Sequence, residues 1–309
     1  LTPLHQLSSN LVKEDVILFK PQDSYRMGGG NGRTSKTAGT NHPGGVAINF
    51  FIKEKEANKP ISLQIFDSNN KLIKAFSTKP NKNKKEETLK LENGNNIFYW
   101  DMMYPGAEKV KGMILWWASL NGPMALPGNY KVTLTMGEIS KSQNFTILKN
   151  PVSETSIADA TAQFNFINDI NAKVTEIHKA LKNVKKVRAQ VKALKKSIKG
   201  NEKHSGLLTY ADNLLKEMTS IEETLYQTKS KSNQDPLNFP IRLNNKLAHL
   251  NSLTRIGSYA PTQQAIDFKN EINKKIDQEL AKLYDLFDNK VKVLNQKVKD
   301  SQIDLIQLD

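Results

Sequence analysis

Two carboxylates, Asp101 and Glu108, lie close together in the sequence around a turn-rich stretch. Glycoside hydrolases use such a pair, one carboxyl as the acid and the other as base or nucleophile. Carboxylates this close are common by chance, however, and Asp101 is expected to end a β-strand. We therefore predict no catalytic residue in this chain. A glycoside hydrolase that uses these two carboxylates is the third of three functions considered below.

A glycine-rich stretch, "RMGGGNGRTSKTAGTNHPGG" at residues 26–45, invites comparison with phosphate-binding loops. A P-loop would need Gly where Met27 stands and Lys where Arg33 stands, and Arg33 also occupies the last glycine of a dinucleotide-binding pattern. No alternation of strand and helix surrounds the stretch. We interpret it as a connector between two strands and predict no nucleotide cofactor.

Metal binding is not indicated either. The chain has no cysteine, and no two of its five histidines are spaced to place ligands on one strand or helix turn. These histidines are His5, His42, His178, His204 and His249. We therefore predict no metal site.

The net charge of +14 comes from 45 lysines and arginines, of which only 5 are arginine. Base readout and bidentate phosphate contacts favour arginine, so we predict no nucleic-acid partner. The longest apolar run, residues 113–118, is far shorter than the ~20 residues that span a bilayer. We therefore predict no membrane span.

The three tryptophans of the chain, Trp100, Trp116 and Trp117, lie within one short region. If residues 96–101 and 112–118 are strands, both faces of both strands are apolar, whereas a sheet of a free-standing sandwich normally has one polar face. We expect one face to be sandwich core and the other to pack on another domain. A carbohydrate-stacking platform is the alternative. The interface or ligand-contact candidates are Trp100, Trp116, Trp117, Tyr104, Lys185 and Lys192, the two lysines being on the first long helix.

The hydrophobic period divides the chain near Pro151. Before it, short alternating runs separated by Gly, Pro and Asn predict an antiparallel Ig-like β-sandwich over residues 1–150, including the connector 26–45. The expected strands are 15–20, 46–53, 61–67, 71–77, 96–101, 112–118, 129–136 and 139–148.

After Pro151, apolar residues recur every three or four positions, which predicts an α-helical domain over residues 151–309. Ser156 and Asp159 are a plausible cap for a first helix over 156–199. A second helix is expected to run to about residue 229, a third to use Leu243 to Leu253, and a fourth to begin at Pro261. The predicted fold class is therefore α+β in two domains, the second an up-and-down four-helix bundle with long first and last helices. Asn244 and Asn245 are expected to satisfy loop backbone groups near a helix start.

Three pieces of the sequence resemble a known family. They are "LFKPQDSYRMGGG…NHPGGVAINFFIKE", "WDMMYPGAEKVKGMILWWASLNGPMALPGNYKV" and "YQTKSKSNQDPLNFPIRLNNKLAHL". Together they resemble the C-terminal region of bacterial sortilin-like, Asp-box β-propeller proteins labelled as glycosyl hydrolases. The second piece also resembles an Ig-like module of the flagellar hook-capping type. The resemblance implies a periplasmic, cell-surface or secreted parent, with an upstream propeller that is absent here because no Asp-box repeat occurs.

These observations predict a non-catalytic accessory and interaction region of a larger exported protein, which supports or positions the upstream propeller. The alternative is a stand-alone module that binds a glycan or a protein through Trp117 or Tyr104 and the lysine face of the first helix.

Overall fold

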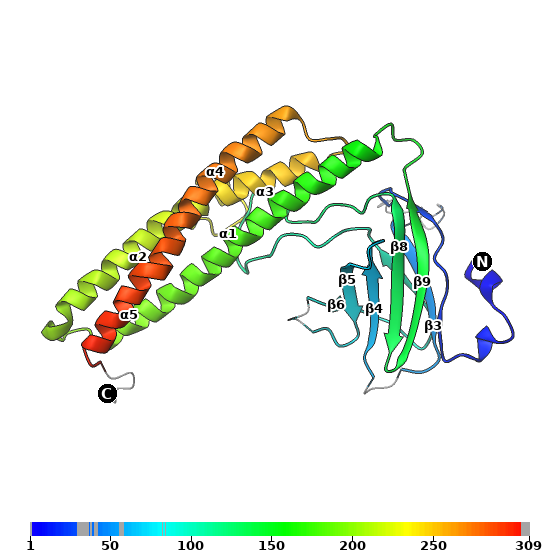
Figure 1. Ribbon diagram of the computed structural model, residues 1–309, viewed down its shortest axis with the longest axis horizontal. Helices are drawn as coiled ribbons and strands as arrows, with labels where there is room; N and C mark the ends of the chain where they lie inside the picture. Colours follow the sequence, from blue (N-terminus) through cyan, green and yellow to red (C-terminus); the bar gives the residue numbers. More distant parts are fainter. Residues whose placement is uncertain are drawn as a thin grey trace. The chain divides into compact units, whose positions relative to one another are not determined.

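The computed structural model describes residues 2–29, 37, 39, 43–55, 59–81, 83 and 85–303 (Figure 1). The chain is α+β and forms two compact units. Unit 1 comprises Leu1–Pro105 and Asn121–Phe164, and unit 2 comprises Gly106–Leu120 and Asn165–Asp309. The chain therefore crosses between the units three times, whereas the sequence predicts one boundary at Pro151. Part of the predicted connector 26–45, including Arg33 and His42, lies outside the described residues.

Unit 1 contains a three-stranded antiparallel sheet with the order β1-β3-β7. Its strands are β1 (Val16–Leu18), β3 (Val46–Ile52) and β7 (Gly94–Trp100). In β3 every second side chain is buried, as the alternation of "VAINFFI" predicts. In β7, Trp100 pairs with Val46 at one end and Gly94 pairs with Ile52 at the other.

A second sheet has six strands in the order β2-β9-β8-β4-β5-β6, and it is mixed because the β2–β9 and β5–β6 pairs are parallel. The β4–β5 turn is closed by the Asp67 carboxylate, which accepts from the backbone N–H groups of Asn69 and Lys71 at 2.9 Å each. The strands are β2 (Ser24–Tyr25), β4 (Ile61–Phe66), β5 (Leu72–Ser77), β6 (Glu87–Thr88), β8 (Gly128–Met136) and β9 (Ile139–Leu148).

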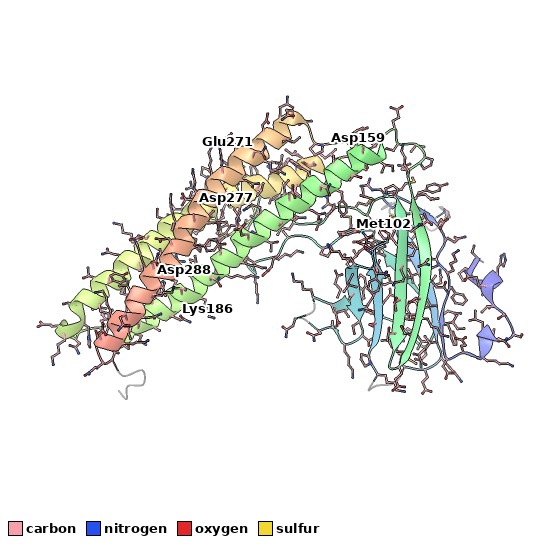
Figure 2. The ribbon with its side chains drawn as sticks, viewed as in Figure 1. Met102, Asp159, Lys186, Glu271, Asp277 and Asp288 are labelled. Carbon is pink, nitrogen blue, oxygen red and sulfur yellow. The ribbon has the colours of Figure 1, made fainter. Side chains whose placement is uncertain are left out.

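Buried side chains of both sheets form one hydrophobic core. Trp100 is only 1% exposed, and its ring centre lies 5.7 Å from that of Tyr130 and 6.1 Å from that of Phe145. Tyr130 is itself anchored, because its hydroxyl donates to the carbonyl of Leu126 at 2.7 Å. Met102, labelled in Figure 2, is fully buried in the same core.

The described helices are α1 (Ile157–Ser197), α2 (Ser205–Leu225), α3 (Leu243–Thr254) and α4 (Gln263–Asp285), which continues through a π-helical turn (Leu286–Lys290) into α5 (Val291–Asp300). The predicted cap of α1 is confirmed. The Ser156 hydroxyl accepts from the N–H of Asp159 at 3.0 Å, and the Asp159 carboxylate accepts from the N–H of Ser156 at 3.2 Å. This reciprocal capping box fixes the start of the longest helix.

The predicted apolar stripe of α1 also lies where the sequence places it. Ile170, Val174, Ile177 and Val184 have no exposed surface, and they share one core with α2, α3, α4 and α5. Because an apolar spacing near 3.5 residues keeps one stripe facing the partner helices, α1 is buried along one side and solvated along the other.

Cross-helix pairs give the direction of each helix. Successive residues of α1 meet decreasing residue numbers in α2 and α3 but increasing numbers in α4, so α2 and α3 run antiparallel to α1 while α4 runs parallel to it. The pairs are Arg188–Glu222 and Lys195–Asp212 with α2, Asn171–Asn251 and His178–Asn244 with α3, and Asp169–Lys269 and Lys173–Asp277 with α4.

The predicted up-and-down alternation of four helices is therefore not what the structure has. The connector between α2 and α3 does not reverse the chain, so these two shorter helices follow one another in the same direction. The proline-containing 3₁₀ turn Asp235–Leu237 lies in this connector, where the Asp235 carboxylate accepts from the N–H of Ser232 at 2.9 Å.

Candidate functional site

The segment Gly106–Leu120, which carries Trp116 and Trp117, belongs to the helical unit and contains no β-strand. The predicted strand over 112–118 is therefore wrong. The segment is an irregular loop whose two ends are tied together, since the N–H of Ala107 donates to the carbonyl of Leu120 at 2.8 Å. Met113, Ala118 and Leu120 pack on the core of the helices. Residues 113–118 are apolar at both odd and even positions because the segment packs on helices. They are not the two buried faces of a strand.

Side chains and backbone groups of the helical unit take the place of strand partners for this segment. Asn245 of α3 makes two hydrogen bonds to Trp116, accepting from its N–H at 2.7 Å and donating to its carbonyl at 2.9 Å. The Tyr226 hydroxyl accepts from the N–H of Ile114 at 3.2 Å, and the N–H of Ser119 donates to the carbonyl of Ala248 at 3.0 Å. The backbone on both sides of Trp117 is therefore fixed.

His178 of α1 holds the start of the segment. It has no exposed surface, its Nδ1 lies 2.5 Å from the carbonyl oxygen of Glu108, and its Nε2 lies 3.5 Å from the side-chain nitrogen of Asn244. A carbonyl can only accept, so Nδ1 carries the proton and Nε2 faces the amide donor. Burial is the main cause that lowers the pKa of His178, and the Lys182 ammonium lowers it further. The histidine is thus a neutral structural group.

Both carboxylates of the hydrolase pair considered above, Asp101 and Glu108, make structural contacts. In unit 1 the Asp101 carboxylate accepts from the N–H of Met103 at 2.9 Å and lies 3.7 Å from the Lys74 ammonium. In unit 2 the Glu108 carboxylate pairs with Lys182. These contacts fix a turn and a loop, and nothing in them points to proton transfer.

The tryptophans occupy three different environments. Trp100 is core, Trp116 is half-buried, and Trp117 is 72% exposed. The ring centres of Trp116 and Trp117 lie 5.9 Å apart. Trp117 also has a left-handed backbone, with φ of 53°, a conformation that costs a bulky residue about 1–3 kcal/mol. Of the three, only Trp117 combines an open ring with a constrained backbone.

The other predicted contact residues are less distinctive. Tyr104 is half-buried, its ring meets that of Phe164 edge-on at 4.8 Å, and burial raises its pKa. Lys185 and Lys192 are exposed on α1, two turns apart. They lie on the solvated side of that helix, as expected.

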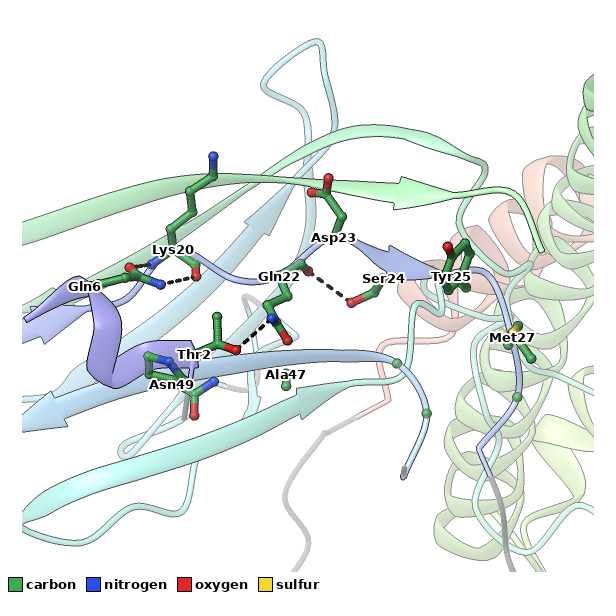
Figure 3. A pocket seen from close by; sticks show the side chains of 14 residues that line it. Thr2, Gln6, Lys20, Gln22, Asp23, Ser24, Tyr25, Met27, Ala47 and Asn49 are labelled. Atoms are coloured by element: carbon green, nitrogen blue, oxygen red, sulfur yellow. Dashed lines mark hydrogen bonds between the residues drawn. The ribbon is translucent and has the colours of Figure 1, made fainter. Parts of the chain in front are cut away.

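A cavity of about 360 Å³ lies in unit 1 beside β3 (Figure 3). The Gln6 side chain donates to the carbonyl of Lys20 at 3.0 Å and accepts from its N–H at 2.8 Å, and the Gln22 amide donates to the Thr2 hydroxyl at 2.9 Å. These bonds tie the N-terminal 3₁₀ turn Thr2–Gln6 to the chain after β1. Because these bonds join the segments that line the cavity, we interpret it as a packing feature.

Sequence reasoning missed His178, Asn244 and Asn245 as the groups that position the tryptophan segment. All three are less than 5% exposed. The available signal was a polar pair on the apolar side of a predicted helix, since Asn244 and Asn251 lie seven residues apart among leucines. Most buried asparagine side chains are hydrogen-bonded, so this pattern favours remote partners.

No known protein family and no curated protein matches this sequence at a significant level. Across the described part of the chain, no helix is long and apolar enough to cross a membrane. The described residues also contain no cluster of three or more His, Asp or Glu side chains that could hold a metal ion.

Proposed function

We propose that this chain is a non-catalytic accessory and interaction region of a larger exported protein. In this proposal unit 1 is an Ig-like β-sandwich that serves as a spacer, and the helical unit carries the contact surface. The shared core of the two sheets supports the sandwich assignment. So does Tyr130, because a tyrosine hydroxyl bound to a carbonyl a few residues upstream is a recurring feature of Ig-like folds.

The exposure of Trp117 carries the proposal. A tryptophan side chain can bury about 150–250 Å², worth about 4–6 kcal/mol at ~25 cal/mol per Å². The fold leaves most of this surface in water and also holds the residue at a φ of 53°. Contacts from Asn245 and Ala248 fix the backbone on either side. A partner that covers the ring accounts for both costs, because exposed, preorganised aromatic anchors dominate many interfaces.

The expected partner is the upstream β-propeller of the same polypeptide, an inference that rests on the family resemblance of the sequence. Lys185 and Lys192 add positive charge to the surface of the same unit and favour an acidic partner face. A glycan ring stacked on Trp117 is the main alternative, because sugar-binding sites also use an exposed indole.

Site-specific photo-cross-linking in the source cells tests the proposal. A benzophenone amino acid replaces Trp117, and the matched control carries it at Leu237, which is 67% exposed in the same unit. We expect a specific product from position 117 and none from position 237. An intramolecular product mapped to the propeller supports the accessory role, and one to another protein supports a stand-alone module. Equal or absent cross-linking at both positions, with Trp117→Ala leaving polysaccharide binding unchanged or undetectable, refutes an interaction role for Trp117.

A further inference from the structure

A second feature of the helical unit is an apolar groove of about 780 Å³, whose lining includes none of the residues discussed so far as contacts. It lies between α3, the first turns of α4 and the loop that joins them, coloured gold to orange in Figure 1. Its volume falls within the range of about 300–1,000 Å³ that small-molecule sites occupy. Leu250, Leu253, Ile256, Tyr259 and Phe268 provide most of its apolar wall.

The wall of this groove is unusually open to solvent. Leu253 is 55% exposed, Ile256 74%, Tyr259 70% and Phe268 39%. Single exposed apolar residues are ordinary on a protein surface, but four around one hollow form the kind of patch that marks a binding site. The groove therefore has both the shape and the surface for an apolar ligand.

The groove is preformed rather than a gap in loose chain. The Thr254 hydroxyl donates to the carbonyl of Leu250 at 2.8 Å and so secures the end of α3, and the Thr262 hydroxyl caps α4 by accepting from the N–H of Ala265 at 3.2 Å. Gly257 has a φ of 75°, and a Cβ added there would lie 2.8 Å from the Tyr259 ring. Glycine thus lets the ring lie against the loop backbone and form one wall.

The charge at the groove specifies the sign of the ligand. The Lys246 ammonium lines it, and no carboxylate does. Within the described residues, the Lys246 ammonium takes part in no ion pair, and the carboxylate of nearby Glu271 is already paired with Lys275 at 2.5 Å. A ligand with an apolar body and an anionic end complements this arrangement.

We propose that this groove binds a long-chain fatty-acid anion, with its acyl chain along Leu253, Ile256 and Phe268 and its carboxylate at Lys246. The size favours an acyl chain over a folded partner, since the hollow has the volume of a small-molecule site and an apolar wall. The proposal is independent of the role of Trp117, which lies on the loop held by Asn245.

The test uses the full chain and a fluorescent fatty acid, 11-(dansylamino)undecanoic acid. We expect a blue-shifted and enhanced emission on binding, and displacement by palmitate. Leu253→Asn is expected to weaken binding about tenfold, since it removes an apolar side chain from the site. The matched control Leu237→Asn changes an exposed leucine outside the groove and should leave affinity unchanged. Lys246→Glu should weaken the probe and palmitate about tenfold each and leave the dissociation constant of uncharged hexadecanol, calculated with the probe affinity of that variant, unchanged.

Several outcomes overturn the proposal. Absence of binding by a chain with native circular dichroism does so, as does equal loss in the Leu253→Asn and Leu237→Asn variants. Preference for a hexadecyl ammonium over palmitate would contradict the charge argument. A dimer in size-exclusion chromatography that Leu253→Asn dissociates would make a second copy of the chain the occupant instead.

Discussion

The two hydrogen bonds between the Asn245 side chain and the Trp116 backbone predict that Asn245→Ala destabilises the helical unit by about 2–4 kcal/mol. Each bond contributes about 0.5–1.5 kcal/mol net, and a backbone group left without a partner costs about 1–3 kcal/mol when water cannot reach it. Trp116 is half-buried, so water reaches its backbone in part and the total stays near the lower end. Release of the left-handed backbone at Trp117 offsets some of the loss.

Urea unfolding followed by far-ultraviolet circular dichroism measures this effect, because the helices dominate the signal. Asn213→Ala is the matched control. Asn213 is exposed on α2, so the same change in chemistry should alter stability by less than about 0.5 kcal/mol. Acrylamide quenching of tryptophan fluorescence should rise in Asn245→Ala as the segment loosens.

Asn245→Asp sharpens the test. An aspartate keeps an acceptor for the N–H of Trp116 but turns the donor that faces its carbonyl into a second acceptor, and it places a charge at a position that is 4% exposed. We expect this variant to be less stable than Asn245→Ala at neutral pH. If Asn245→Ala unfolds within about 0.5 kcal/mol of the unaltered chain, as Asn213→Ala should, the two bonds do not hold the segment.

Two further predictions concern buried titratable groups in the helical unit. Burial lowers the pKa of His178 below its ordinary 6.5, so its contribution to stability is complete above about pH 6.5 and is lost as the pH falls toward the lowered value. Urea titrations at several pH values measure how steeply the free energy of unfolding falls with pH. His178→Gln should reduce this slope by at most ~1.4 kcal/mol per pH unit. Arg188→Met leaves the Glu222 carboxylate, 7% exposed, without the guanidinium 2.5 Å away and should lower the free energy of unfolding by about 3 kcal/mol. Adding Glu222→Leu should restore most of this stability in a double-mutant cycle. Additive losses from the two substitutions would contradict the pairing.

The sequence was informative wherever local periodicity decides the structure. The stripe of α1, its Ser156–Asp159 cap and the alternation in β3 all lie where the pattern predicts them. In each case the residues that determine the helix or strand lie within a few positions of one another or share one face of it. The two-residue strands β2 and β6 were not expected, because two residues carry no period.

The tryptophan segment was misread because its partners are remote in sequence. A run of β-branched, aromatic and aliphatic residues has strand propensity, but propensity reflects the surface on which the residues pack. The backbone of Trp116 pairs with a side chain 129 positions later in the chain. No local pattern shows such a partner. Asn245 does satisfy loop backbone groups, as expected, but those of a distant loop rather than of its own helix start.

The direction of α3 has a different cause, which lies in the connector that precedes it. Short connectors normally reverse the chain between neighbouring helices, which is why the sequence predicts alternation. The connector between α2 and α3 instead forms its own 3₁₀ turn, and the Gln227 amide donates to the carbonyl of Pro240 at 2.9 Å. This bond ties the two ends of the connector together, so that α3 begins near the end of α2 and continues its direction.

The three crossings between the units predict that the helical unit is not self-sufficient when cut at the sequence boundary. A fragment of residues 151–309 lacks Gly106–Leu120. In it His178 and Asn245, both less than 5% exposed, lose their hydrogen-bond partners. The helix core also loses the apolar side chains of Met113 and Leu120 that pack on it. Buried polar groups without partners and an uncovered core both disfavour folding. We expect the fragment to unfold at lower urea than the helices of the full chain and to bind the dye ANS.

Adding a synthetic peptide of residues 106–120 should restore part of the stability in a concentration-dependent way, because a ligand of the folded state stabilises it by mass action. If the fragment is as stable as the full chain and the peptide has no effect, residues 106–120 do not contribute to the stability of the helices.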